Sequence, residues 1–127
     1  MIYNKDSSRA VRAYVQAHQG GVVEPVVTYK DFIDRTHELD SKIVGMKASD
    51  GTVITDYSNH TIARTFAAMH DGSHDNNKRI GVSVDDIKND LQNGSVRKYA
   101  RAQKYSGNHT HVVVSEKGNI ITVSPGK

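Results

Sequence analysis

Polar side chains that could bind a phosphate group and transfer protons occur at two places in the sequence. The first is a helix predicted to begin at Ser58 or Asn59, on which His60 and Arg64 lie four residues apart and therefore share one face. A helix N-terminus and a neighbouring cation both lower the proton affinity of an imidazole, which favours a neutral His60 able to act as a base. The alternative is an exposed histidine at a helix start with no chemical role.

The second place is the C-terminal stretch from Tyr105 to Pro125. Its pattern predicts two strands, residues 109–115 and 120–124, joined by a tight turn, and Pro125 ends the pairing because it has no N–H to donate. Alternation places His109 and His111 on one face of the first strand, and Thr122 and Ser124 on one face of the second. A strand face that carries small hydroxyl side chains at alternate positions is either exposed to solvent or forms part of a functional site.

Basic side chains are concentrated in the same third of the chain. Residues 95–127 hold six Lys or Arg against one acidic residue, Glu116, whereas residues 1–94 hold 11 Lys or Arg against 13 Asp or Glu. This distribution favours a polyanion such as RNA or DNA, bound through its phosphates. A solvated basic face without a partner is the alternative.

Together these side chains suit metal-independent RNA cleavage, in which a 2′-hydroxyl attacks the adjacent phosphate. A histidine transfers the protons, a step worth about 10²- to 10⁴-fold, and cations and hydroxyls stabilise the charge that develops on the phosphate. DNA lacks the attacking hydroxyl. The candidate set is His60, Arg64, Thr122 and Ser124, with Lys104, Arg101, His109 and His111 holding the RNA.

Two other interpretations remain open. The first is a metal site built from His70 and His74 or from His109 and His111, although Asp71-Gly72 should break a helix between the first two. The second is a basic module, of a phage structural or nucleic-acid-binding kind, that binds without catalysis. The absence of cysteine excludes thiolate zinc sites and cysteine nucleophiles, and no cofactor is indicated.

The elements that must position these residues give an α+β domain: helices first, then a small antiparallel sheet. The sequence predicts helices over residues 7–19, with Val11, Tyr14 and Val15 on one face, over 29–40 after the capping residue Thr28, and over 83–94 after Ser83. It predicts strands over residues 42–48 and 52–57 around Asp50-Gly51, and a single strand over 95–106. Gly20-Gly21 divides the 127-residue chain into a helical arm, 1–21, and a domain, 22–127. No apolar run approaches the roughly 20 residues that cross a bilayer.

The run from Ser58 to Pro125 resembles the toxin nucleases of the barnase, EndoU, colicin D and RelE-like (BECR) group, which occur in phage structural proteins and in polymorphic and contact-dependent growth inhibition toxins. Three motifs carry the resemblance, in order: Ser58-Asn-His60 with Arg64, Gly81-Val-Ser-Val-Asp-Asp-Ile87 followed by Asn93-Gly94, and Gly118-Asn-Ile-Ile-Thr-Val-Ser-Pro125. They cover about half of the chain, and residues 1–57 lie outside them.

This resemblance implies an RNase-like fold and a toxin ribonuclease, often one that cuts tRNA, delivered into the cytoplasm of a target cell and neutralised by a dedicated immunity protein. It implies that His60 is the helix histidine of the group, and that Thr122 and Ser124 are its polar pair on the last strand. Colicin D-like members carry lysines just before the histidine, whereas this chain has Asp56 and no lysine there. The cation that binds the phosphate is therefore left to Arg64, Arg101 or Lys104.

Overall fold

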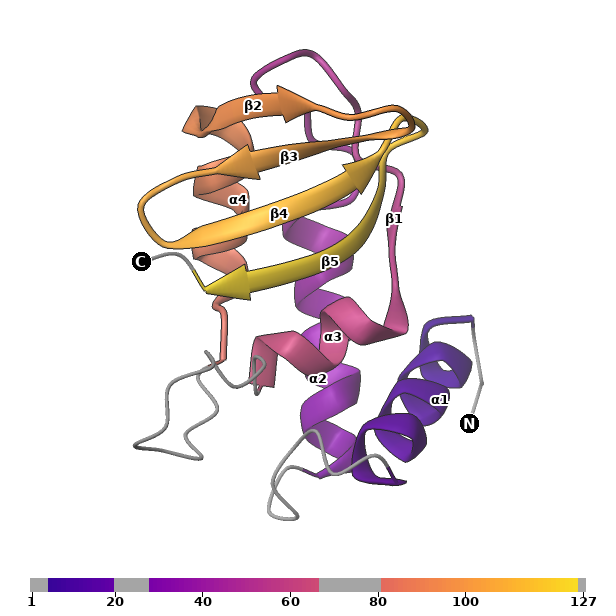
Figure 1. Ribbon diagram of the computed structural model, residues 1–127. Coiled ribbons are helices and arrows are strands. Elements are labelled where there is room, and N and C mark those ends of the chain that lie inside the picture. Colours follow the sequence, from indigo (N-terminus) through magenta and orange to yellow (C-terminus); the bar gives the residue numbers. More distant parts are fainter. Residues whose placement is uncertain (1–4, 20–27, 67–80, 126–127) are drawn as a thin grey trace.

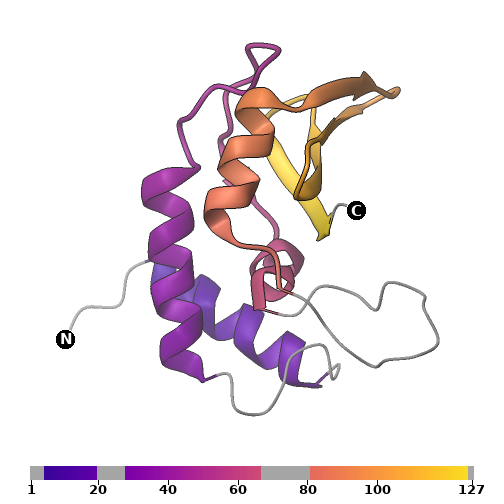
Figure 2. The ribbon, with the colours of Figure 1, turned by 90° about the vertical axis from the view of Figure 1, so that its left-hand side faces the viewer.

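A computed structural model describes residues 5–19, 28–66 and 81–125 of the chain, and shows helices packed on one side of a five-stranded sheet (Figures 1 and 2). The elements in chain order are α1 (Lys5–Gln19), α2 (Tyr29–Lys42), β1 (Asp56–Tyr57), α3 (Asn59–Phe66), α4 (Val84–Asn93), β2 (Ser95–Lys98), β3 (Ala102–Ser106), β4 (Thr110–Ser115) and β5 (Asn119–Pro125). The predicted α+β class is confirmed. None of the described helices is long and apolar enough to cross a membrane.

The sheet is mixed rather than antiparallel, with the strand order β1-β5-β4-β3-β2. The strands from β2 to β5 pair as antiparallel neighbours, but β1 pairs in parallel with the beginning of β5. The hairpin of two strands expected around Asp50-Gly51 is wrong. Only its turn, where Gly51 adopts a φ of +92°, and one isolated bridge between Lys47 and Val53 are present. Because α2 continues to Lys42 and the later residues pair with β5, no long strands form on either side of that turn.

The single strand predicted over residues 95–106 is wrong, because the chain reverses between β2 and β3. The N–H of Tyr99 donates to the carbonyl of Ala102 at 2.8 Å and closes this turn. The turn sets a new register, in which Arg97 lies opposite Lys104 and Val96 lies opposite Tyr105. The closing hairpin between β4 and β5 agrees with the prediction, and Gly118 provides its turn with a φ of +93°.

One face of the sheet is covered by helices, and its residues form the core. The row Val96, Tyr105, Val112 and Val123 crosses the strands from β2 to β5 on this face, and all but Val96 are buried. The core is completed by Phe32 and Leu39 of α2, Val84, Ile87 and Leu91 of α4, and Ile62 of α3, as their spacing predicts.

The inward face of α1 differs from the prediction. Ala10, Ala13 and Ala17 are buried, whereas Val11 and Val15 are 39% and 41% exposed. The alanines join the same core as the rest of the protein, since small side chains let α1 approach α2 and α3 closely. α1 also begins before Ser7, so this serine is not its N-cap. The boundary expected at residue 21 lies outside the described residues and stays a prediction.

The other face of the sheet is covered by no described element, and we call it the open face (Figure 2). Two rows cross it from β2 to β5: Ser95, Ser106, His111 and Ser124 form one, and Arg97, Lys104, Val113 and Thr122 form the other. A β-bulge lies next to the second row, because Val113 pairs with Thr122 and Val114 with Ile120, which leaves Ile121 as the extra residue. None of these row residues is acidic.

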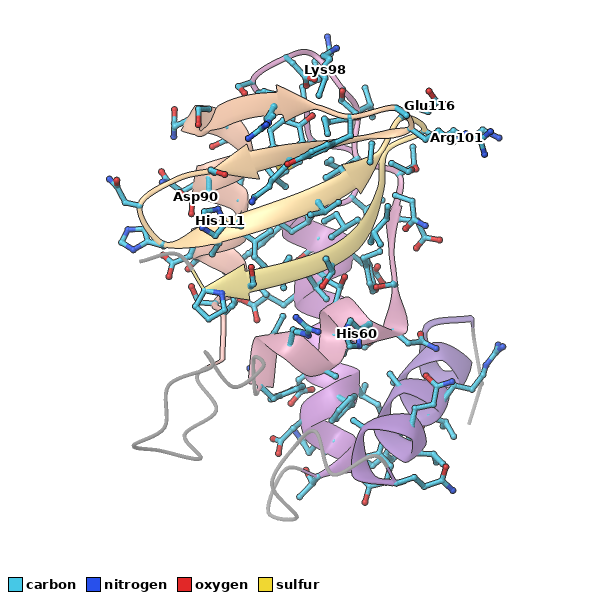
Figure 3. All side chains as sticks on the ribbon, viewed as in Figure 1. His60, Asp90, Lys98, Arg101, His111 and Glu116 are labelled. Atoms are coloured by element: carbon cyan, nitrogen blue, oxygen red, sulfur yellow. The ribbon has the colours of Figure 1, made fainter. Side chains whose placement is uncertain are left out.

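A buried carboxylate on α4 fixes the beginning of β4. Asp90 is 1% exposed, and its Oδ2 accepts hydrogen bonds from the Thr110 N–H (2.7 Å), the Thr110 hydroxyl (2.8 Å) and the His109 N–H (3.2 Å). Gly107 packs so closely on this carboxylate that a Cβ there would collide with it. Asp90 thereby holds the strand that carries His111 (Figure 3).

We predict that Asp90→Asn lowers the free energy of unfolding by about 2 to 4 kcal/mol, because an amide at this position loses the charge and turns an N–H₂ group toward N–H donors. The matched control is Asp85→Asn, since Asp85 lies on the same helix with a side chain that is 75% exposed and should change stability by less than about 1 kcal/mol. Urea denaturation of both variants measures the difference. Equal effects would contradict the role given to Asp90.

Candidate functional site

Helix α3 begins directly against the free edge of β5. The Ser58 hydroxyl oxygen accepts from the Thr61 N–H at 3.0 Å, which makes Ser58 the N-cap, and the same hydroxyl donates to the Ile121 carbonyl at 2.7 Å. The Ser58 N–H donates to the Ile120 carbonyl at 2.9 Å. The cap that starts the helix therefore also places it beside the strand that carries Thr122 and Ser124.

Arg64 is a buried cation whose partners in the described part of the chain are neutral. Only 9% of the residue is exposed, and its Nη1 donates to the Val123 carbonyl at 3.2 Å while its Nη2 donates to His60 Nε2 at 2.5 Å. No carboxylate among the described residues forms a salt bridge with it. Burial lowers the pKa of the guanidinium, which still remains protonated at neutral pH. A buried charge without a counter-ion is costly, and a bound anion would offset that cost.

The contact with Arg64 defines the state of the His60 ring. A guanidinium has no acceptor, so Nε2 must accept the hydrogen bond, and the proton of the neutral imidazole lies on Nδ1. His60 is exposed on α3, yet partial loss of water around its ring lowers its pKa, and the positive charge of Arg64 lowers it further. The direction expected from the sequence is thus confirmed, with burial as the larger cause.

Thr122 and Ser124 lie on either side of Val123, whose carbonyl holds Arg64, and both belong to the open-face rows. The Oγ1 of Thr122 is buried and has no hydrogen-bond partner in the described part of the structure. No hydrogen bond joins His60 to either hydroxyl among the described residues. The structure therefore brings His60 and Arg64 to the segment of β5 that carries the two hydroxyls.

The other predicted residues divide into two groups. His111 lies opposite Ser124 on β4, and Lys104 shares the open face with them. Figure 3 shows β5 between His111 and His60, and it shows Arg101 near Glu116, away from both histidines. Arg101 belongs to the turn after β2, and its carbonyl accepts from the Glu116 N–H. The structure does not bring Arg101 to this site.

His109 precedes β4, and its N–H donates to Asp90. Two further open-face residues were missed at the sequence level. Ser106 lies opposite His111, and its hydroxyl is 2.9 Å from His111 Nδ1. Arg97 faces the same side as Lys104, although an uninterrupted strand over residues 95–106 would have put the two on opposite faces. A turn placed at residues 99–101 would have revealed both.

The metal interpretation gains no support from the part of the chain that the structure describes. No group of three or more histidine and carboxylate side chains there could hold an ion. His70 and His74 lie outside the described residues.

The chain matches no protein-family model, no curated protein and no solved structure. The resemblance to toxin nucleases therefore stays a prediction. A function has to be inferred from the geometry of the site.

We predict that His60 titrates with a midpoint below the ordinary value of 6.5 for histidine. In Arg64→Gln the midpoint should rise only part of the way back, since the neighbouring charge is removed while the burial remains. An NMR titration of the ring resonances measures both values, and an unchanged backbone spectrum is the control for folding. A midpoint at or above 6.5 in the unmodified protein would contradict this account of the site.

We also predict that Thr122→Val leaves the free energy of unfolding unchanged or raises it by up to about 1 kcal/mol, because it removes a buried hydroxyl that has no partner in the described part of the structure. Thr110→Val is the matched control and should cost about 1.5 to 3 kcal/mol, because its hydroxyl bonds the Asp90 carboxylate. Chemical denaturation compares the two. A large loss in Thr122→Val would show that its hydroxyl is engaged in the folded protein.

Proposed function

We propose that this protein is a ribonuclease that cleaves RNA without a metal ion and acts as a toxin. The observation that carries the proposal is the buried guanidinium of Arg64, which is bonded to a neutral imidazole and lies beside two strand hydroxyls. A phosphate is the anion that fits this arrangement, because arginine binds phosphate oxygens and hydroxyls donate to them.

The contact between Arg64 and His60 suggests how a substrate would start the reaction. A phosphate that takes the Nη2 donor of Arg64 releases the lone pair of His60 Nε2. That nitrogen then accepts the proton of the 2′-hydroxyl, the 2′-oxygen bonds to phosphorus, and the bond from phosphorus to the 5′-oxygen breaks. The products are a 2′,3′-cyclic phosphate and a 5′-oxygen that takes a proton from solvent.

Each remaining group has a role in this scheme. Arg64 and the Ser124 hydroxyl stabilise the charge that grows on the phosphate, and the buried Thr122 hydroxyl joins them once its side chain turns outward. The lowered pKa of His60 keeps it unprotonated at neutral pH, as a base must be. The pH at which activity is lost on acidification should therefore lie below 6.5.

The resemblance to BECR toxins supplies the biological part of the proposal. It suggests tRNA as the RNA, delivery into the cytoplasm of a target cell, and an immunity protein as the partner. An acidic immunity protein that covers the open face would complement its charge, since the open-face rows contain Arg97 and Lys104 and no acidic residue.

A second candidate function is RNA or DNA binding without catalysis, as in a nucleic-acid-binding or phage structural module. The absence of acidic residues from the two open-face rows favours it, because this property serves binding whether or not a reaction follows.

We predict that the protein cleaves tRNA or total RNA in the presence of a chelator, and that His60→Ala lowers the rate by at least about 100-fold because it removes the base. The matched control is His37→Ala, since His37 is an exposed histidine on α2 and should leave the rate unchanged. Gel analysis of the RNA, with circular dichroism of each variant, measures the effect.

Two outcomes would contradict the ribonuclease proposal. Binding of RNA at micromolar protein without cleavage would favour the second candidate function. Loss of cleavage on addition of the chelator would favour a metal-dependent reaction.

A further inference from the structure

The open face continues beyond the candidate site, and three of its residues on β3 and β4 form a second polar cluster. Lys104 and Ser106 are two residues apart on β3 and point to the same face, and His111 lies directly opposite Ser106 on β4. All three are half-buried. The cluster is built by the two central strands, whereas Arg64 and His60 are held by α3 at the edge of β5.

Contacts within the protein fix the geometry of the cluster. The Ser106 hydroxyl is 2.9 Å from His111 Nδ1, which fixes the plane of the imidazole and leaves Nε2 to meet a ligand. The pairing of Lys104 with Val113 and of Ser106 with His111 holds the backbone of both strands in place. An ammonium, an imidazole and a hydroxyl on one rigid face are groups that bind a phosphate.

The cluster extends from the border of the first site to a strand further in, because His111 on β4 lies opposite Ser124 whereas Lys104 and Ser106 lie on β3. Neighbouring strands lie about 4.8 Å apart, so β3 lies roughly 10 Å from β5. Lys104 therefore lies two strands inward from the strand whose edge Arg64 contacts. Two phosphates of one RNA strand can occupy both places if the strand crosses the sheet from β5 toward β3.

We propose that Lys104, Ser106 and His111 form a second phosphate subsite, which holds a phosphate next to the one that is cleaved. The inference rests on the proposed ribonuclease function and deepens it, because it makes the substrate a single RNA strand with at least two successive phosphates over the open face. Lys104 supplies charge, His111 supplies a donor, and Ser106 positions the imidazole.

The test uses oligonucleotides that contain a single ribose, so that only one phosphate can be cleaved, and that carry a neutral methylphosphonate in place of the phosphate on one side or the other. For the unmodified protein, one of the two replacements should lower kcat/KM about tenfold, mainly through KM. In Lys104→Met the same replacement should have almost no further effect, because the ammonium that binds this phosphate is already absent. Lys117→Met is the matched control, since Lys117 is an exposed lysine in the turn between β4 and β5 and should keep the full tenfold response.

A second measurement separates this inference from the proposed function. The affinity for an all-deoxy strand of the same sequence, which cannot be cleaved, should fall in Lys104→Met and in Ser106→Ala. In Lys104→Met the slope of log affinity against log salt concentration should also become shallower by about 0.7, because this variant neutralises one phosphate fewer.

The outcomes distinguish the two proposals. If the binding effects appear but RNA is not cleaved, the subsite stands and the ribonuclease proposal fails. If RNA is cleaved but the methylphosphonate effect is absent, or is equally large in Lys104→Met, the subsite is overturned.

Discussion

The free edge of β5 is the constraint on which the rest of this structure depends. β1 pairs only with the first two residues of β5, so the carbonyls that follow need other donors. Side chains of α3 and its cap provide them: Ser58 donates to Ile121, Thr61 to Ile120, and Arg64 to Val123. A helix thus closes an edge that a strand would usually close. The same contacts bring an imidazole and a guanidinium to the border of the open face.

Arg64 serves two requirements that conflict. As an edge donor it must be buried, and burial of a cation between neutral partners is unfavourable. As the proposed phosphate ligand it must keep a donor available, and its Nη2 donor is directed at His60. Among the described residues no carboxylate pairs with this cation, and a carboxylate there would compete with a phosphate for it. Functional sites commonly keep such unfavourable arrangements.

Local signals in the sequence were enough to predict the elements with strong caps and turns. Thr28 and Ser83 cap α2 and α4 as expected, and Gly118 provides the turn of the last hairpin. The pairing of His60 with Arg64 was also predictable, because it depends only on helical spacing. The alternation of side chains along a strand likewise predicted that Thr122 and Ser124 share one face of β5.

Contacts between distant segments were not predictable in this way. The turn between β2 and β3 contains no glycine, asparagine or proline, so the sequence gives no local signal that the chain reverses there. The parallel pairing of Asp56 with Asn119 joins residues far apart in the sequence. The role of Asp90 depends on a loop that meets it only in the folded state. The first of these contacts, the turn between β2 and β3, puts Arg97 on the same face as Lys104.

The extra residue in β5 marks a place where the strand can change length. Side chains alternate along a strand, so a strand without Ile121 would run from Ile120 directly to Thr122, with Ile120 and Val123 still on the core side and Thr122 and Ser124 still on the open face. The bulge takes up Ile121 without turning the later residues over. Loss of one residue at this position would therefore leave the orientation of both hydroxyls unchanged.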